Sequence, residues 1–140
     1  MIKTHDYRVW TGTRMDYDVL VGGHGVFHIE VSEHHDKLEE YKDGVPVMQF
    51  TGLYDMDGKK IYSGDILHFS TFAWGALDIQ RIGCVLMKNG SYDVWAGADF
   101  EWFDETNDSI ILCMVCDDSN VIGNIHEHSE KLPKFQGIRQ

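Results

Sequence analysis

Residues 49–67, QFTGLYDMDGKKIYSGDIL, decide the fold of this chain. They predict a strand, a tight turn at residues 55–58, a returning strand at 59–62 and a second break at 63–65. Aspartate side chains accept hydrogen bonds from nearby backbone N–H groups, and glycine tolerates positive φ, so both breaks have turn chemistry. The stretch is therefore interpreted as one turn-and-strand unit.

The residues of this stretch are expected to be architectural. Its glycines recur every six residues, each where the chain must turn or kink, and its aliphatic residues anchor the core. The motif residues are Gly52, Leu53, Asp55, Gly58, Ile61, Tyr62, Gly64 and Asp65, with Ile66 as a further core anchor.

Strand patterns precede this unit. Residues 7–10 (YRVW) and 15–20 predict two strands joined by a glycine-containing turn, an N-terminal hairpin. Residues 26–31 (VFHIEV) alternate, with Val26, His28 and Glu30 on one face, as in a half-buried strand. Residues 32–44 are polar and predict either a short surface helix or a mobile loop.

Further strands follow the unit. Residues 66–72 predict one strand, and residues 79–88 and 91–95 flank Asn89-Gly90, a strong signal for a two-residue hairpin turn. Residues 110–116 (IILCMVC) form a continuous apolar run, which predicts a fully buried strand. Residues 121–125 predict a last strand before a tail.

Many short strands joined by Gly and Asp turns predict an all-β fold with little helix. We expect a small, partly open barrel, SH3-like, after an N-terminal hairpin. At 140 residues the chain is expected to form a single domain. Its expected parts are N-terminal strands and a variable loop (1–46), a barrel core (47–127) and a tail (128–140).

Three segments together resemble the YopX-like family of phage and prophage proteins. The central run is similar to the family pattern FTGL-x-D-x-x-G-x-x-I-Y-x-G-D-I. Residues 7–10 are similar to its F-R-A-W segment, and residues 121–127 (VIGNIHE) to its V-I-G-N-I-x-E segment. The chain departs from the family after Glu127, where the usual Asn-Pro-Glu-Leu is replaced. The resemblance implies a phage or prophage origin and a mostly-β pseudobarrel, and it implies no reaction, substrate or catalytic residue.

The charge and hydropathy of the chain limit the classes of function that it can have. The net charge is −11 with 12 Lys and Arg scattered along the chain, so a basic track for phosphate is absent and nucleic-acid binding is disfavoured. Acidity serves solubility, or it suits a partner with a basic surface. Neither an apolar run of about 18 residues nor an apolar N-terminal signal occurs. We expect no membrane contact and a location in the cytoplasm of the bacterial host.

Cys113 and Cys116 form a C-x-x-C, and His126 and His128 could complete a zinc site. Strand-like flanks and the His-x-His spacing argue against zinc and favour cysteines packed in the core. Two other patterns favour bland interpretations: a solvated acidic surface over residues 33–40, and a plain turn at Asp55-x-Asp57-Gly58 where a calcium loop would begin.

Catalytic signals are weak. Ser63, Asp65 and His68 are close in sequence, but His68 takes the opposite strand face. The sequence has no G-x-S-x-G motif and no phosphate-binding glycine loop. We therefore expect no catalytic residue and no cofactor.

An acidic and aromatic segment, residues 97–107, supplies the candidates for partner contact: Phe100, Trp102 and Phe103. The leading hypothesis is a non-enzymatic phage accessory protein that binds an unknown protein partner and forms a homo-oligomer. The alternative is a nucleic-acid-associated small barrel, which needs convergence of Arg8, Arg14, Lys59, Lys60, Arg81 and Lys88 on one face. A metal-dependent enzyme is the third hypothesis.

Overall fold

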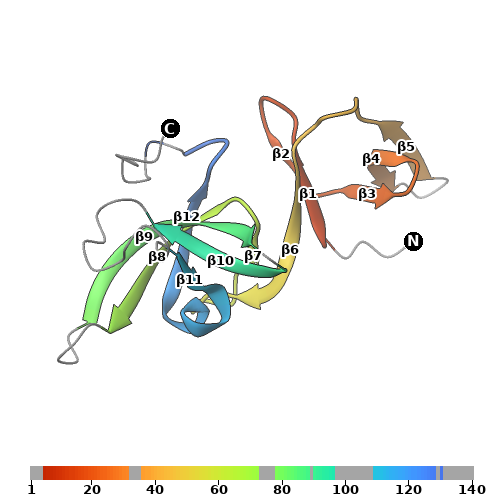
Figure 1. Cartoon of the computed structure of the whole chain (residues 1–140). Coiled ribbons are helices and arrows are strands. Elements are labelled where there is room, and N and C mark those ends of the chain that lie inside the picture. The colour runs from red at the N-terminus through yellow and green to blue at the C-terminus, as the bar shows by residue number, and fades with distance from the viewer. Residues whose placement is uncertain are drawn as a thin grey trace. The chain divides into compact units, whose positions relative to one another are not determined.

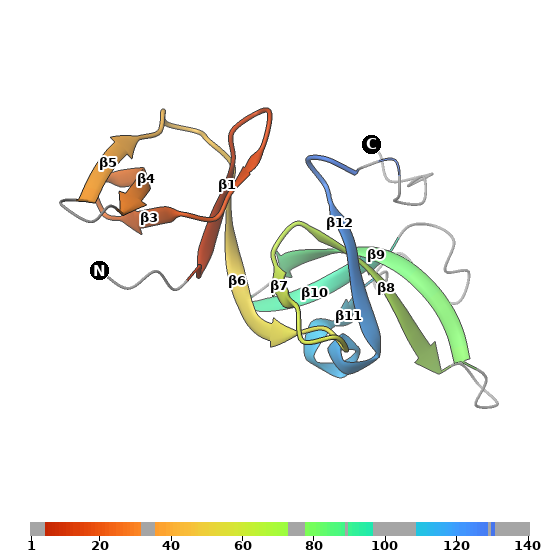
Figure 2. The same ribbon diagram turned by 180° about the vertical axis from the view of Figure 1, so that it is seen from behind.

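The computed structural model describes residues 5–31, 36–72, 78–88, 90–96, 109–128 and 130 (Figures 1 and 2). It is a small, mostly-β fold, as the turn and strand patterns predict. Two compact units divide the chain at Phe50, and each is described by itself below. The expected subdivision at residues 46 and 127 stays a prediction.

Unit 1 (Met1–Phe50) contains two sets of antiparallel strands. In the first, β1 (Tyr7–Trp10) lies between β2 (Met15–Asp16) and the first residues of β6 (Val47–Tyr54). In the second, β4 (Gly25–Val31) lies between β3 (Val19–Gly22) and β5 (Asp36–Glu40).

Two predictions for this unit are wrong. Residues 15–20 are not one strand, because the Asp16 side chain accepts the backbone N–H of Asp18 and breaks the chain between β2 and β3. Within residues 32–44, Asp36–Glu40 is neither helix nor loop but strand β5. Its pairing with β4 places Leu38 opposite Ile29, and this tertiary pairing outweighs a weak local helix signal.

Unit 2 (Thr51–Gln140) begins with the second half of β6, which pairs with β7 (Lys60–Tyr62). A five-stranded antiparallel sheet follows, in the order β11-β10-β9-β8-β12. Its strands are β8 (Asp65–Phe72), β9 (Asp78–Lys88), β10 (Ser91–Ala96), β11 (Ser109–Ile111) and β12 (Ser119–Asn124). The predicted two-residue hairpin is confirmed, since Lys88 pairs with Ser91.

The core of unit 2 lies on one face of this sheet. Leu67 and Phe69 alternate along β8, and Val85 pairs with Val94 between β9 and β10. Val94 is 1% exposed and Val85 is fully buried, as is Ile61 of β7. Two of the expected anchors, Ile61 and Ile66, are fully buried, and Leu53 packs against the same core.

The prediction of one buried strand over residues 110–116 is wrong. Only Ser109–Ile111 is strand, and two 3₁₀ helices follow, η1 (Leu112–Met114) and η2 (Cys116–Asp118), beside β11 in Figures 1 and 2. Leu112, Val115 and Cys116 are buried, while Met114 is exposed. This spacing fits a helical turn, and a continuous apolar run cannot by itself distinguish it from a strand.

Within the described residues, no helix has the length and apolar character that crossing a membrane requires.

Candidate functional site

A buried carboxylate, Asp16, organises a polar cluster in unit 1. Asp16 is 2% exposed. Its Oδ2 lies 2.7 Å from Nδ1 of His28 on β4 and accepts a 2.6 Å hydrogen bond from the Tyr41 hydroxyl, while Oδ1 accepts the Asp18 N–H at 2.9 Å. A carboxylate only accepts, so His28 donates from Nδ1 and its Nε2 is left as an acceptor when the ring is neutral.

Hydrogen bonding sets the protonation states in this cluster. Burial alone would raise the pKa of Asp16, but the hydrogen bonds from Tyr41, the Asp18 backbone and His28 outweigh it and lower that pKa below 3.8. Burial, followed by the bond to the Asp16 carboxylate, raises the pKa of Tyr41 to about 12. At neutral pH Asp16 is therefore anionic and Tyr41 is a neutral donor.

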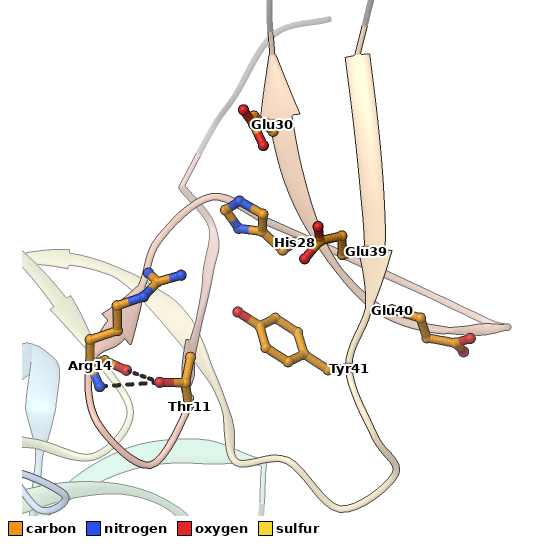
Figure 3. A pocket seen from close by; sticks show the side chains of 7 residues that line it. All are labelled: Thr11, Arg14, His28, Glu30, Glu39, Glu40 and Tyr41. Atoms are coloured by element: carbon orange, nitrogen blue, oxygen red, sulfur yellow. Dashed lines mark hydrogen bonds between the residues drawn. The ribbon is translucent and has the colours of Figure 1, made fainter.

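A cavity of about 320 Å³ opens beside this cluster (Figure 3). Figure 3 shows the His28 ring, the Tyr41 hydroxyl and the Arg14 guanidinium around its centre, with Glu30 and Glu39 near His28. Strands β4 and β5 supply one wall, and the loop between β1 and β2 supplies the other. The lining residues are Thr11, Arg14, His28, Glu30, Glu39, Glu40 and Tyr41.

The central motif joins distant parts of unit 2 through Asp55. Asp55 Oδ1 accepts the backbone N–H groups of Asp57 and Lys59, both at 2.9 Å. Its Oδ2 accepts the N–H of Val121 on β12 at 3.0 Å. The Met56 N–H also donates to the Ser119 carbonyl at 2.9 Å. The turn at residues 55–58 thus covers the outer edge of β12.

The second break of the motif acts in the same way. Asp65 Oδ2 accepts the Tyr62 N–H at 2.7 Å, which closes the turn. The Gly64 N–H donates to the Val85 carbonyl, and the Gly64 carbonyl accepts the Ile125 N–H. Gly52, Gly58 and Gly64 all have φ between 82° and 87°, which glycine adopts without strain. The motif is therefore architectural, as expected.

The C-terminal signature forms a closed turn around Asn124. The Asn124 Oδ1 accepts the N–H groups of His126 and Glu127 at 3.0 Å, and its Nδ2 donates to Glu127 Oε1. The Asn124 N–H donates to Nδ1 of His128 at 3.2 Å, and the His128 N–H returns to the Asn124 carbonyl. A Cβ at Gly123 would lie 2.7 Å from the His128 ring, so this close approach needs glycine.

Residues 49–67 and 121–127, two of the segments that carry the family resemblance, thus form hydrogen-bonded turns in unit 2. A sequence model of the family described as YopX protein matches residues 6–133. The chain belongs to the YopX protein family. The resemblance carried by residues 49–67 is thereby confirmed.

A solved structure shares the fold of this YopX-family protein. The crystal structure of protein EF1440 from Enterococcus faecalis superposes with a TM-score of 0.54. The two chains are 24% identical, and the match covers 91% of this chain and 97% of that one, which shows a shared fold. No curated protein sequence matches this chain.

The prediction that both cysteines pack in the core is wrong for Cys113, which is exposed on η1, because residues 112–118 form 3₁₀ turns and not a buried strand. Cys116 is buried on η2, where burial and then the nearby Asp117 raise the pKa of its thiol. The His126 N–H donates to Asn124 Oδ1. His128 Nδ1 already accepts the Asn124 N–H. Among the residues that the structure describes, no three His, Cys, Asp or Glu side chains are placed to hold a metal ion.

Phe100, Trp102 and Phe103, the candidates for partner contact, lie outside the described residues. Their segment connects β10 to β11. Leu86 on β9 and Ile111 on β11 both pair with Asp93 of β10, so the two aliphatic side chains share one sheet face, on either side of Asp93. Leu86 is 40% exposed, Ile111 47% and the nearby Met114 73%. We call Leu86, Ile111 and Met114 the apolar edge.

Sequence reasoning missed the cluster in unit 1. Its members Asp16, His28 and Tyr41 are 12 to 25 residues apart and come together only through strand pairing. The alternation of residues 26–31 correctly placed His28 and Glu30 on one face, and this was the available signal. Glu39 and Glu40, expected on a solvated acidic surface, line the cavity, while Glu33, His34 and His35 lie outside the described residues.

Proposed function

We propose that this YopX protein is a non-enzymatic phage or prophage accessory protein that acts by protein–protein contact and forms a homo-oligomer through the apolar edge. The supporting observation is β11. It is the terminal strand of the sheet in the described part of the chain, and it bears exposed Ile111. A strand edge with unpaired backbone groups is a template for a strand from another chain.

The two ends of the sheet differ in what they offer. The outer edge of β12 is occupied, because Met56 donates to Ser119 and Asp55 accepts the Val121 N–H. The β11 edge carries Ser-Ile-Ile, which has no charge to oppose self-pairing. In unit 1, the edge strand β5 has the sequence DKLEE, and its acidic residues disfavour pairing with a second copy. Of these three edges, self-association therefore favours β11.

The aromatic candidates are part of this proposal. Phe100, Trp102 and Phe103 belong to the connection that leads directly into β11, so contact through this connection and through the apolar edge would use one neighbourhood of the chain. Replacing Trp102 with Ala should abolish self-association or partner capture and leave the domain folded. Unfolding of this variant would instead assign Trp102 to the core.

Sedimentation velocity tests the oligomer. About half of the Ile111 side chain is exposed, so its burial contributes about 1 kcal/mol per copy, or about 30-fold in the dimer Kd for two copies. Ile111→Asp should weaken association by at least this factor. Leu38→Asp, at an equally exposed apolar position on β5, is the matched control and should leave it unchanged. A wild-type chain that stays monomeric over a wide concentration range would refute the proposal.

A nucleic-acid role is disfavoured by one of the six cations that it would need. Arg8 is 3% exposed and lies over the Tyr17 ring at 5.9 Å. It is therefore not free to track a phosphate backbone. Absence of a gel shift at low salt is the expected result.

The proposed location, the cytoplasm of the bacterial host, is tested by fractionating phage-carrying cells.

A further inference from the structure

The hydroxyl and ring N–H donors of the cavity in unit 1 are already committed. His28 donates from Nδ1 to Asp16, and the Tyr41 hydroxyl donates to the same carboxylate. The Thr11 hydroxyl donates to the Arg14 carbonyl at 3.2 Å. The Arg14 guanidinium lies 4.0 Å from Asp16 Oδ1, beside the buried anion, and its side chain is 60% exposed. The donors that this wall offers to a ligand are therefore those of Arg14.

Acceptors remain available on the same wall. Register pairs His28 with Glu39 across β4 and β5, which places both side chains on one sheet face, and Glu30 follows two residues after His28 on that face. Figure 3 shows both carboxylates near the imidazole. Within the described chain, no ion pair or hydrogen bond engages the side chains of Glu30 and Glu39, and no partner is recorded for His28 Nε2.

The buried Asp16 gives the histidine a fixed role. Asp16 Oδ2 lies 2.7 Å from His28 Nδ1 and fixes the orientation of the ring, and in the neutral tautomer that donates from Nδ1 the Nε2 atom is an acceptor. Three carboxylates line the cavity against one guanidinium, and Lys37 pairs with Glu30 across β4 and β5. Its preferred occupant is therefore a cation that brings several N–H donors.

We propose that the cavity binds a guanidinium or alkylammonium group, with Glu30, Glu39 and His28 Nε2 as its acceptors. A guanidinium presents planar, paired donors that suit carboxylates, and the volume of about 320 Å³ is at the lower end of ligand pockets, enough for one basic side chain. A divalent metal fits less well, because no metal-binding group of three ligands occurs among the described residues. This inference does not rest on the apolar edge.

Binding of a guanidinium is tested by titrating the protein with butylguanidinium. The ¹H–¹³C NMR signals of the His28 and Tyr41 rings report on the titration. Both signals should shift saturably with a Kd of about 1 mM, a value suited to so small a ligand. Glu39→Gln should weaken binding about tenfold, because it removes a charged acceptor. Glu130→Gln, the same charge change at an exposed position in unit 2, should have no effect.

The source of the cation is distinguished with peptides. N-acetyl-Gly-Arg-Gly-amide binding more tightly than butylguanidinium assigns the cavity to a segment of a basic partner protein, whereas equal affinity assigns it to a free small cation. The same tripeptide with citrulline, which lacks the charge, should not bind. The proposal is overturned if butylguanidinium gives no saturable shift, if the citrulline peptide binds equally, or if Glu130→Gln weakens binding as much as Glu39→Gln. Glu39→Gln should leave sedimentation unchanged, so failure here is separable from failure of the oligomer.

Discussion

Replacing Asp55 with Asn should destabilise unit 2 by about 3 kcal/mol, although the shape of the side chain is conserved. The carboxylate is 6% exposed and accepts three backbone N–H groups. An asparagine can keep its carbonyl toward Asp57 and Lys59, but its amide then faces the Val121 N–H, donor against donor. The lost bond and unpaired N–H cost about 1 to 3 kcal/mol. Conversion of the other two bonds from charged to neutral adds about 0.5 kcal/mol each.

Equilibrium urea unfolding, followed by tryptophan fluorescence, measures this loss against a stability that is typically about 5 to 15 kcal/mol. Asp57→Asn is the matched control, because it makes the same charge change in the same turn. In the wild type, Asp57 Oδ2 accepts one exposed hydrogen bond from Asn120 Nδ2 at 2.6 Å, and the amide oxygen of an asparagine can also accept this bond. The control should cost less than about 1 kcal/mol. Equal losses in the two variants, or a loss below about 1 kcal/mol for Asp55→Asn, would refute the argument.

Three further predictions follow from close contacts and shifted pKa values. Gly83→Ala should destabilise the β9–β10 pair by more than about 2 kcal/mol, because its Cβ would lie 2.6 Å from the Trp95 carbonyl oxygen; thermal unfolding checks this, and an unchanged Tm would contradict it. The raised pKa of Tyr41 means that its stabilising contribution is complete below pH 10.0 and is lost as pH rises from 10.0 to about 12. Tyr41→Phe should abolish this loss of stability at high pH. It should also remove the tyrosinate absorbance that titrates near pH 12. The lowered pKa of Asp16 means that its contribution to stability is complete above pH 3.8 and is lost as pH falls below 3.8. Hydrogen exchange of β3–β5 should therefore depend on acid pH in the wild type but not in Asp16→Asn.

Most of unit 2 could be predicted from the sequence because each of its turns is determined by residues that are close together in the chain. Asp55, Gly58 and Gly64 have turn chemistry that operates within a few residues, and Asn89-Gly90 sets the register of its hairpin directly. The apolar run at residues 110–116 gave a wrong prediction, because a continuous apolar run has no periodicity that distinguishes a strand from a helical turn. The burial of Leu112, Val115 and Cys116 needed the fold for its interpretation.

The candidate site was beyond local reasoning for a different physical cause. Asp16 looks like any turn aspartate until β4 and β5 bring His28 and Tyr41 to it. The residues 32–44, which gave only weak signals, contain the strand that builds one wall. Polar clusters of this kind depend on which strands pair, and pairing is decided by contacts far apart in sequence.

The bond between Asp55 and Val121 spans 66 positions, and the one between Asp57 and Asn120 spans 63. During synthesis, the turn that precedes β7 therefore waits for the last strand to leave the ribosome, a delay of roughly 3 to 13 s at ordinary rates of translation. Until then the Asp55 carboxylate accepts only the Asp57 and Lys59 N–H groups, and the edge of β8 that pairs with β12 is uncovered. A chain that ends before β12 therefore keeps residues 49–67 in sequence but lacks both of these bonds, and we expect its unit 2 to be less stable.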